Sequence, residues 1–246
     1  MIVTIHQPHF LPWAGYLHRM ARADLFVLLD HVQFERGNYQ NRTRILMNGR
    51  SGPEARWVTV PVVQRSQKER IVDKEIDNRL EGPRRWGPIH YATLRQAYRT
   101  APHLAPYAAE LKKILEASWT RLIDLNLALL GFLRDALGIR TPMVRSSELG
   151  VDGAKSELIL RLCQAVGADC FLGGLGGTRA YLDSAAFERA GIAVRWQQFS
   201  HPRYTQHGSA GPFVAGLSSL DLLFNCGPGS RDLLLKETGA HEPLAV

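Results

Sequence analysis

Residues 1–34 read MIVTIHQPHFLPWAGYLHRMARADLFVLLDHVQF, which contains a strand, a turn, a helix and a second strand in that order. The β-branched run Ile2–Ile5 is typical of a buried strand. Pro8 ends that strand, because proline has no N–H group to donate to a sheet ladder. Residues 16–22 have helical character, and residues 25–29 form a second apolar run. The stretch therefore predicts a βαβ unit.

Polar side chains follow both predicted strands. In open α/β sheets, ligands bind beyond the carboxyl ends of the strands. We therefore predict that His6, His9 and Asp30 are catalytic, and that neighbouring residues of the same unit bind substrate. The predicted substrate-binding residues of this unit are Gln7, Tyr16 and Gln33.

The length and composition fit an α/β protein with a sizeable core. The chain has 246 residues, of which 45% are hydrophobic, and no repeat or linker divides it. The dipeptide Asn48-Gly49 indicates a hairpin, and residues 56–62 and 71–77 have extended patterns. We predict a single α/β domain over residues 1–246, with a mixed, mostly parallel sheet and a helical subregion at about residues 86–140.

No apolar run approaches the roughly 20 residues that a membrane helix needs. The N-terminus begins directly with a strand pattern and has no signal-peptide pattern. We therefore expect a cytoplasmic protein with no integral membrane association.

The cysteines and histidines favour neither a disulfide framework nor a metal site. Cys163, Cys170 and Cys226 are odd in number and include no Cys-x-x-Cys pair. The histidines include no His-x-x-x-His helical pair near the predicted site. We therefore expect no metal, although the histidines and Asp30 at the strand ends are the residue types that would bind one.

The formal net charge of +7 indicates an anionic partner. Nucleotide phosphates, a nucleotide-sugar, a tRNA or a membrane surface would all suit it. The basic clusters at residues 42–50 and 79–85 lack the interleaved aromatic residues of nucleic-acid modules. A generally basic surface is therefore the alternative to a dedicated nucleic-acid site.

Two later segments have the residue types of anion sites. Asn41 and Arg42 follow the second strand, and an arginine fork can bind a planar anion. A glycine-rich loop, GGLGGT at residues 173–178, follows a predicted short strand, so that backbone N–H groups around Gly174 can approach a phosphate. Lys155 is expected to reach the same anion. The loop is neither a Walker loop nor a dinucleotide fingerprint.

A proline-containing loop follows the strand predicted over residues 192–197. His201, predicted to be catalytic, lies in this loop together with Tyr204 and Gln206, predicted to bind substrate. Asp221 interrupts a Leu/Phe stripe, which predicts either a residue facing a polar pocket or a helix cap.

Several motifs together resemble the WbqC-like family. They are HQPHFLPWAGY from His6, DHVQF from Asp30, Asn41-Arg42, WVTVP from Trp57, HPRYTQ from His201 and SLDLLFNCG from Ser219. The resemblance covers nearly the whole chain in order. It implies a place among genes for O-antigen and other surface glycans or in natural-product pathways, and a transferase-like role.

The opening unit also resembles that of HIGH-type nucleotidylyltransferases. Residues 12–16 stand where those enzymes have His-x-Gly-His, with Trp13 and Tyr16 in place of the two histidines. The resemblance implies a related fold, and the two replacements argue against the same chemistry.

Three functions are consistent with these residues. The first is acyl or aminoacyl transfer to an amine, with a histidine base oriented by Asp30 or Asp221 and with Gln7 or Asn41 as oxyanion donors. Its acceptor would be a small amine or an amino sugar, and its anionic donor an acyl-CoA or an aminoacyl-tRNA. The second is nucleotidyl or nucleotide-sugar transfer with a nucleotide. The third is a non-catalytic binding protein of a glycan pathway.

Overall fold

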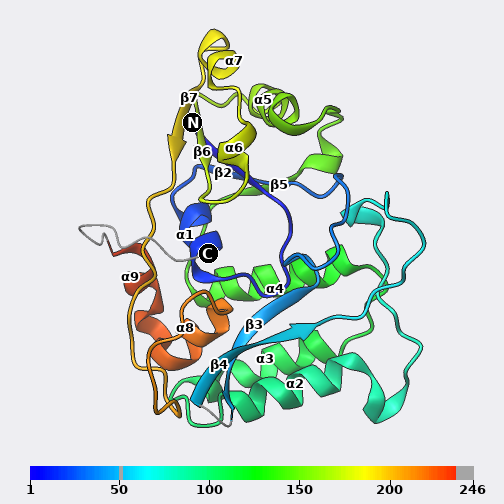
Figure 1. The fold of residues 1–246 in the computed structure, drawn as a ribbon, viewed down its shortest axis with the longest axis vertical. Coiled ribbons are helices and arrows are strands. Elements are labelled where there is room, and N and C mark those ends of the chain that lie inside the picture. The colour runs from blue at the N-terminus through cyan, green and yellow to red at the C-terminus, as the bar shows by residue number, and fades with distance from the viewer. Residues whose placement is uncertain (50–51, 237–246) are drawn as a thin grey trace.

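The computed structural model of the protein describes residues 1–49 and 52–236 (Figure 1). Its main sheet has five strands in the order β5-β2-β1-β6-β7, and every neighbouring pair is parallel. A separate antiparallel sheet pairs β3 with β4. The predicted α/β fold with a mostly parallel sheet is therefore confirmed. The antiparallel strands are not part of the main sheet and form a separate hairpin.

The strands are β1 (Ile2–His6), β2 (Leu25–Leu28), β3 (Arg42–Gly49), β4 (Gly52–Thr59), β5 (Met143–Arg145), β6 (Cys170–Gly173) and β7 (Ala193–Trp196). The helices are α1 (Ala14–Ala21), α2 (Trp86–Ala97), α3 (Leu104–Glu116), α4 (Leu122–Ala136), α5 (Lys155–Ala165), α6 (Thr178–Tyr181), α7 (Ser184–Arg189), α8 (Ser219–Cys226) and α9 (Ser230–Leu235).

Strand β1 lies at the centre of the main sheet and sets the position of its neighbours. Val3 is opposite Leu25 of β2 and Phe171 of β6. Because both pairings are parallel, the carboxyl ends of β1, β2 and β6 meet at one edge of the sheet. Continuing the β1–β6 register brings Gly174, just past β6, beside His6 at the end of β1.

The main sheet is covered on both faces, as parallel sheets generally are. Successive side chains of β2 point to opposite faces, so that Phe26 and Leu28 join one core and Val27 joins the other. The smaller core packs Val3 and Val27 against α5 and α7. The larger core contains α1, α4 and α8 and continues to the β3–β4 hairpin and helices α2 and α3, at the opposite end of the molecule from α7 (Figure 1).

The segment at residues 71–77 departs from the extended structure predicted for it. Ile71–Asp73 forms a single 3-10 turn, and Glu75 and Ile76 make only isolated bridges. The backbone N–H of Ile71 donates to Val32 O at 2.9 Å, and the next N–H donates to Asp30 O at 2.8 Å. The start of the segment therefore bonds to the chain after β2, and its end bonds to residues 61–63 and to Thr120.

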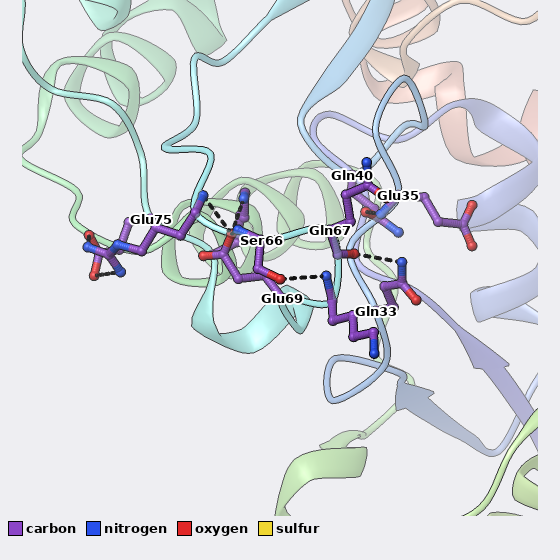
Figure 2. Close-up of polar contacts among 10 residues, drawn as sticks. Gln33, Glu35, Gln40, Ser66, Gln67, Glu69 and Glu75 are labelled. Atoms are coloured by element: carbon purple, nitrogen blue, oxygen red, sulfur yellow. Dashed lines mark hydrogen bonds and ion pairs between the residues drawn. The ribbon is translucent and has the colours of Figure 1, made fainter.

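A buried ion pair fixes this segment beside the loop that follows β2. Lys74 is 0% exposed, and its Nζ lies 2.6 Å from Glu69 Oε2. The same Nζ lies 5.0 Å from the centre of the Phe34 ring. Phe34 N–H donates to Glu69 O at 2.8 Å, and Figure 2 shows Gln33 Nε2 donating to Gln67 O nearby.

Replacing Glu69 by glutamine should lower the free energy of unfolding by about 3 kcal/mol, because it leaves a buried ammonium without its counter-charge. Urea unfolding at neutral pH measures the change. The matched control is Glu54→Gln, which removes an exposed carboxylate paired with Arg56 and should cost less than about 1 kcal/mol. Equal losses in the two variants would contradict this role of the buried pair.

Candidate functional site

A cavity of about 410 Å³ opens at the carboxyl ends of β1 and β6. The turn after β1, helix α1, the loop at residues 35–39, the glycine-rich loop and Gln197 after β7 all contribute to its wall. The described residues that line it include His6, Gln7, His9, Tyr16, Arg19, Glu35, Asn38, Tyr39, Gly174, Thr178 and Gln197. It therefore lies where an open parallel sheet generally binds its ligand.

Aromatic rings form one side of the cavity. The His6 and His9 ring centres are 4.5 Å apart, and the Tyr16 ring lies 4.6 Å from His6 and 5.2 Å from His9. Tyr39, from the loop after β2, stacks on His9 at 5.4 Å. The end of β1, the following turn and the first turn of α1 thus bring three titratable rings into contact.

The turn between β1 and α1 is held in an unusual backbone conformation. Leu11 has φ of 45°, in the left-handed region that non-glycine residues rarely adopt. Its carbonyl accepts a hydrogen bond from Thr43 Oγ1 at 2.9 Å, and Pro12 O accepts one from Ser219 Oγ at 2.7 Å. Bonds from β3 and α8 therefore fix the turn that carries His9.

The hydrogen bond of His6 fixes its tautomer. Nδ1 lies 3.0 Å from Gln7 O, and since a carbonyl oxygen only accepts, the proton is on Nδ1. Nε2 is left with a lone pair. Burial, followed by the charge of Arg19 and the neighbouring His9, lowers the pKa of His6 well below its ordinary value. The ring is therefore neutral at pH 7 and can accept a proton.

His9 and Tyr16 are also held neutral, and each has a polar atom without a partner. Burial, with a smaller contribution from Arg19, lowers the pKa of His9 to about 3. Burial raises the pKa of Tyr16. His9 Nδ1 and the Tyr16 hydroxyl are buried with no hydrogen-bond partner among the described residues. Buried polar atoms are generally paired, so these two are available to a ligand.

Arg19 is the cation of the cavity. It is 4% exposed and lies on α1 three residues after Tyr16. Burial lowers its pKa to about 10, so it is still charged at neutral pH. Its Nε has no hydrogen-bond partner, and no acidic side chain in the described ranges forms an ion pair with it.

The glycine-rich loop after β6 forms the wall beside Arg19. A Cβ atom at Gly174 would lie 2.0 Å from Arg19 Nη1, so a larger residue here would displace the guanidinium. Gly173, one residue earlier, packs against the Trp196 ring, where a Cβ would lie 2.5 Å away. The absence of a side chain thus allows Gly173 to pack against Trp196 and allows Gly174 to lie beside the Arg19 guanidinium.

Gln40 holds the loop at residues 35–39 in place. Its Nε2 donates to Gln7 Oε1 at 2.8 Å, and its Oε1 accepts from Glu35 N–H at 2.8 Å (Figure 2 shows the second contact). Asn126 Nδ2 donates to Gln40 O at 2.9 Å. Gln7 therefore lines the cavity and also supports its wall. The Glu35 carboxylate accepts from Asn38 Nδ2 at 2.7 Å.

The structure places Asp30 outside this cavity. Its carboxylate accepts from Arg145 Nε at 2.7 Å, from Ser146 Oγ at 3.1 Å, and from both N–H and Oγ of Ser147 at 2.9 Å. Burial opposes ionisation, but these bonds keep the pKa of Asp30 below its ordinary value. Asp30 ties the end of β2 to the chain after β5.

A second polar cluster surrounds Asp221, and its residues are not among those that line the cavity. Asp221 Oδ2 accepts from Tyr204 Oη at 2.7 Å and from Gln206 Nε2 at 2.8 Å. Burial raises the pKa of Asp221, and these bonds oppose the rise. His201 donates from Nδ1 to Pro202 O at 3.1 Å, and its ring lies 5.5 Å from that of Phe213. His201, Tyr204, Gln206 and Asp221 therefore form a group of their own.

Of the remaining predicted binding residues, Gln7, Tyr16 and Gly174 line the cavity, whereas Gln33, Asn41, Arg42 and Lys155 do not. Asn41 Nδ2 donates to Val60 O at 2.8 Å, and Gln33 Nε2 donates to Gln67 O. The Arg42 guanidinium lies 3.9 Å from the centre of the Trp57 ring and donates to Gly37 O. Lys155 is exposed at the start of α5.

Sequence reasoning missed several residues of the cavity, chiefly Arg19 and Gln197. Both residues have sequence positions that indicate the cavity. Arg19 is one helical turn after Tyr16, and Gln197 directly follows the carboxyl end of β7, just as His6 lies at the carboxyl end of β1. Gln197 Nε2 donates to Gly15 O at 2.7 Å and to His18 Nδ1 at 3.0 Å, which joins the sheet edge to α1.

Within residues 1–49 and 52–236, no group of three or more His, Cys, Asp and Glu side chains is arranged to hold a metal ion. No helix in these ranges is long and apolar enough to cross a lipid bilayer.

Comparison with known proteins gives a family match over most of the chain. The model of the WbqC-like protein family matches residues 7–233. A Mycobacterium tuberculosis protein, Uncharacterized protein Rv1507c, is 32% identical over 234 residues, covering 94% of this chain and 96% of that protein. No solved structure matches.

Acidification should destabilise the protein through its buried neutral histidines. The pKa of His9 is lowered to about 3 by burial, against about 6.5 in the unfolded chain. Between these values the unfolded state binds a proton that the folded state does not, so stability falls as the pH falls. Each such histidine contributes about 1.4 kcal/mol per pH unit.

The His9→Gln variant should therefore lose about 1.4 kcal/mol per pH unit less than the parent protein between pH 5.5 and 4.5. Urea unfolding across that range measures the slope. His207→Gln, which removes an exposed imidazole, is the control and should keep the parent slope. An unchanged slope in His9→Gln would show that His9 is not held neutral.

Proposed function

This chain belongs to the WbqC-like protein family, and we propose that it is a transferase of surface-glycan or natural-product biosynthesis that moves an acyl or aminoacyl group onto an amine. The observation that carries the proposal is the state of His6. Its Nδ1 proton is held by Gln7 O, its Nε2 is free, and burial keeps it neutral in a cavity at the strand ends. A neutral imidazole with a lone pair on Nε2 can act as a general base in amine acylation.

In the proposed reaction, the amine nitrogen forms a bond to the donor carbonyl carbon. The bond from that carbon to the sulfur or oxygen of the leaving group breaks. His6 Nε2 accepts the proton released by the amine and returns it to the departing thiolate or alkoxide. Tyr16, with a neutral hydroxyl that has no partner, is placed to donate to the developing oxyanion.

Two further features support direct transfer between bound substrates. The described residues that line the cavity include no serine or cysteine, and the hydroxyl of Thr178 is within hydrogen-bond distance of Tyr181 Oη, which favours attack by the acceptor itself over a covalent enzyme intermediate. Glu35 supplies a carboxylate to the cavity wall, suited to hold an acceptor that enters as an ammonium ion and loses one proton to solvent before its neutral amine attacks. The acceptor would then be a small amine or an amino sugar.

A product screen tests the function. Purified protein is incubated with acyl-CoA or aminoacyl-tRNA donors and with amines or amino sugars, and the mass of the products is followed. For a donor and acceptor that give a product, His6→Gln should lower kcat/KM by about 10²- to 10⁴-fold, the usual contribution of a general base. The His207→Gln control, at an exposed histidine, should keep the parent value.

The outcomes separate this function from its alternatives. Unchanged turnover in His6→Gln would remove His6 as the base. Turnover that requires ATP and Mg²⁺ would favour nucleotidyl transfer. Tight binding of an amine without turnover, retained in His6→Gln, would favour a non-catalytic binding protein.

A further inference from the structure

The Arg19 side chain has a charge that the described structure leaves uncompensated. Arg19 is 4% exposed, and its Nε has no hydrogen-bond partner. The groups that contact or face it are His6, His9 and Tyr16, all neutral at pH 7, and none of them supplies a negative charge. Burying an unpaired cation is unfavourable, so this arrangement indicates that an anion normally completes it.

Backbone donors adjoin this cation. No backbone hydrogen bond in the described structure uses the N–H groups of residues 174–177 as donors, although the carbonyls of Gly176 and Gly177 accept from α6. A Cβ at Gly176 or Gly177 would meet nothing within 4 Å, so a ligand can approach the backbone closely. Successive free N–H groups in a turn are the donors that bind phosphate oxygens.

We propose that Arg19 and the backbone of residues 174–177 form a phosphate-binding subsite of the cavity. A phosphate group suits this subsite better than a carboxylate, because it offers more oxygens and more charge to a guanidinium and several N–H groups. His9 Nδ1, which has no partner, supplies a further polar contact at the edge of the subsite. Glu35 is the acidic residue of the cavity wall and would exclude a second anion from its own side.

In the proposed transferase, the phosphate subsite would bind the donor. Only this assignment to the donor rests on the proposed function, because phosphate binding itself does not require turnover. A phosphate near His6 places the donor beside the base, while the carboxylate of Glu35 favours a cationic acceptor. The subsite therefore gives the donor and the acceptor separate positions in one cavity.

Calorimetric titration of the full chain with pyrophosphate tests the subsite, with malonate as a dicarboxylate comparison. Pyrophosphate should bind at least 10-fold more tightly than malonate. Arg19→Gln should weaken pyrophosphate binding by 30-fold or more. Gly174→Ala, which keeps the charge but places a Cβ 2.0 Å from Arg19 Nη1, should weaken it by about 10-fold.

The matched control is Arg179→Gln, which removes an exposed positive charge from α6, next to the loop, and should change the affinity by less than twofold. Thermal unfolding confirms that each variant is folded. Pyrophosphate binding that survives both Arg19→Gln and Gly174→Ala, or a parent protein that does not bind pyrophosphate, would overturn the proposal.

Two competitors then identify the source of the phosphate. Adenosine 3′,5′-bisphosphate represents a CoA-type donor, and the trinucleotide CCA represents the end of a tRNA. Displacement of pyrophosphate by either supports the subsite and assigns the donor. Phosphate binding without any transfer would uphold the subsite and reject the transferase, whereas transfer with an unchanged donor KM in Arg19→Gln would reject the subsite and leave the transferase standing.

Discussion

The parallel pairing of β1 with both β2 and β6 is the constraint on which the site depends. It brings His6 at the end of β1 and Gly174 after β6 to one edge, although about 170 residues separate them in the chain. The pairing also orients α1, which leaves that edge and returns to β2. Tyr16 and Arg19, one turn apart on α1, are thereby directed toward the same cavity. The side chains of the cavity meet because the sheet has this register.

The cavity is a destabilising feature that the rest of the fold offsets. His9, Tyr16 and Arg19 are each less than about a tenth exposed and each has an unpaired polar atom. Such groups lower stability by desolvation, and functional sites commonly retain them. Two hydrophobic cores, one on each face of the sheet, supply the compensating burial. The turn at Leu11 adds backbone strain and is fixed by side chains from β3 and α8.

Local pattern predicted much of the fold and the position of two histidines that line the cavity. The β-branched run, Pro8 and the second apolar run were enough to predict β1 and β2, and His6 and His9 follow from where β1 ends. Parallel register is set by tertiary packing and has no local signal. The sequence therefore could not show that Asp30 bonds to Arg145 and two serines, or that His201 packs beside Tyr204. Neither residue lies in the cavity with His6.

Hydrogen-bond satisfaction separates the polar clusters of this protein more clearly than residue type does. Asp30 and Asp221 are buried carboxylates beside histidine or tyrosine, which are the components expected of a catalytic site, yet their oxygens accept bonds from surrounding side chains. Around the cavity, three of the eight buried, unpartnered side-chain polar atoms of the described residues belong to His9, Tyr16 and Arg19. A satisfied network rigidifies a fold, whereas convergent unsatisfied atoms are free to bind a ligand. The cavity therefore differs from the other two polar clusters in the buried polar atoms that its residues leave unpaired.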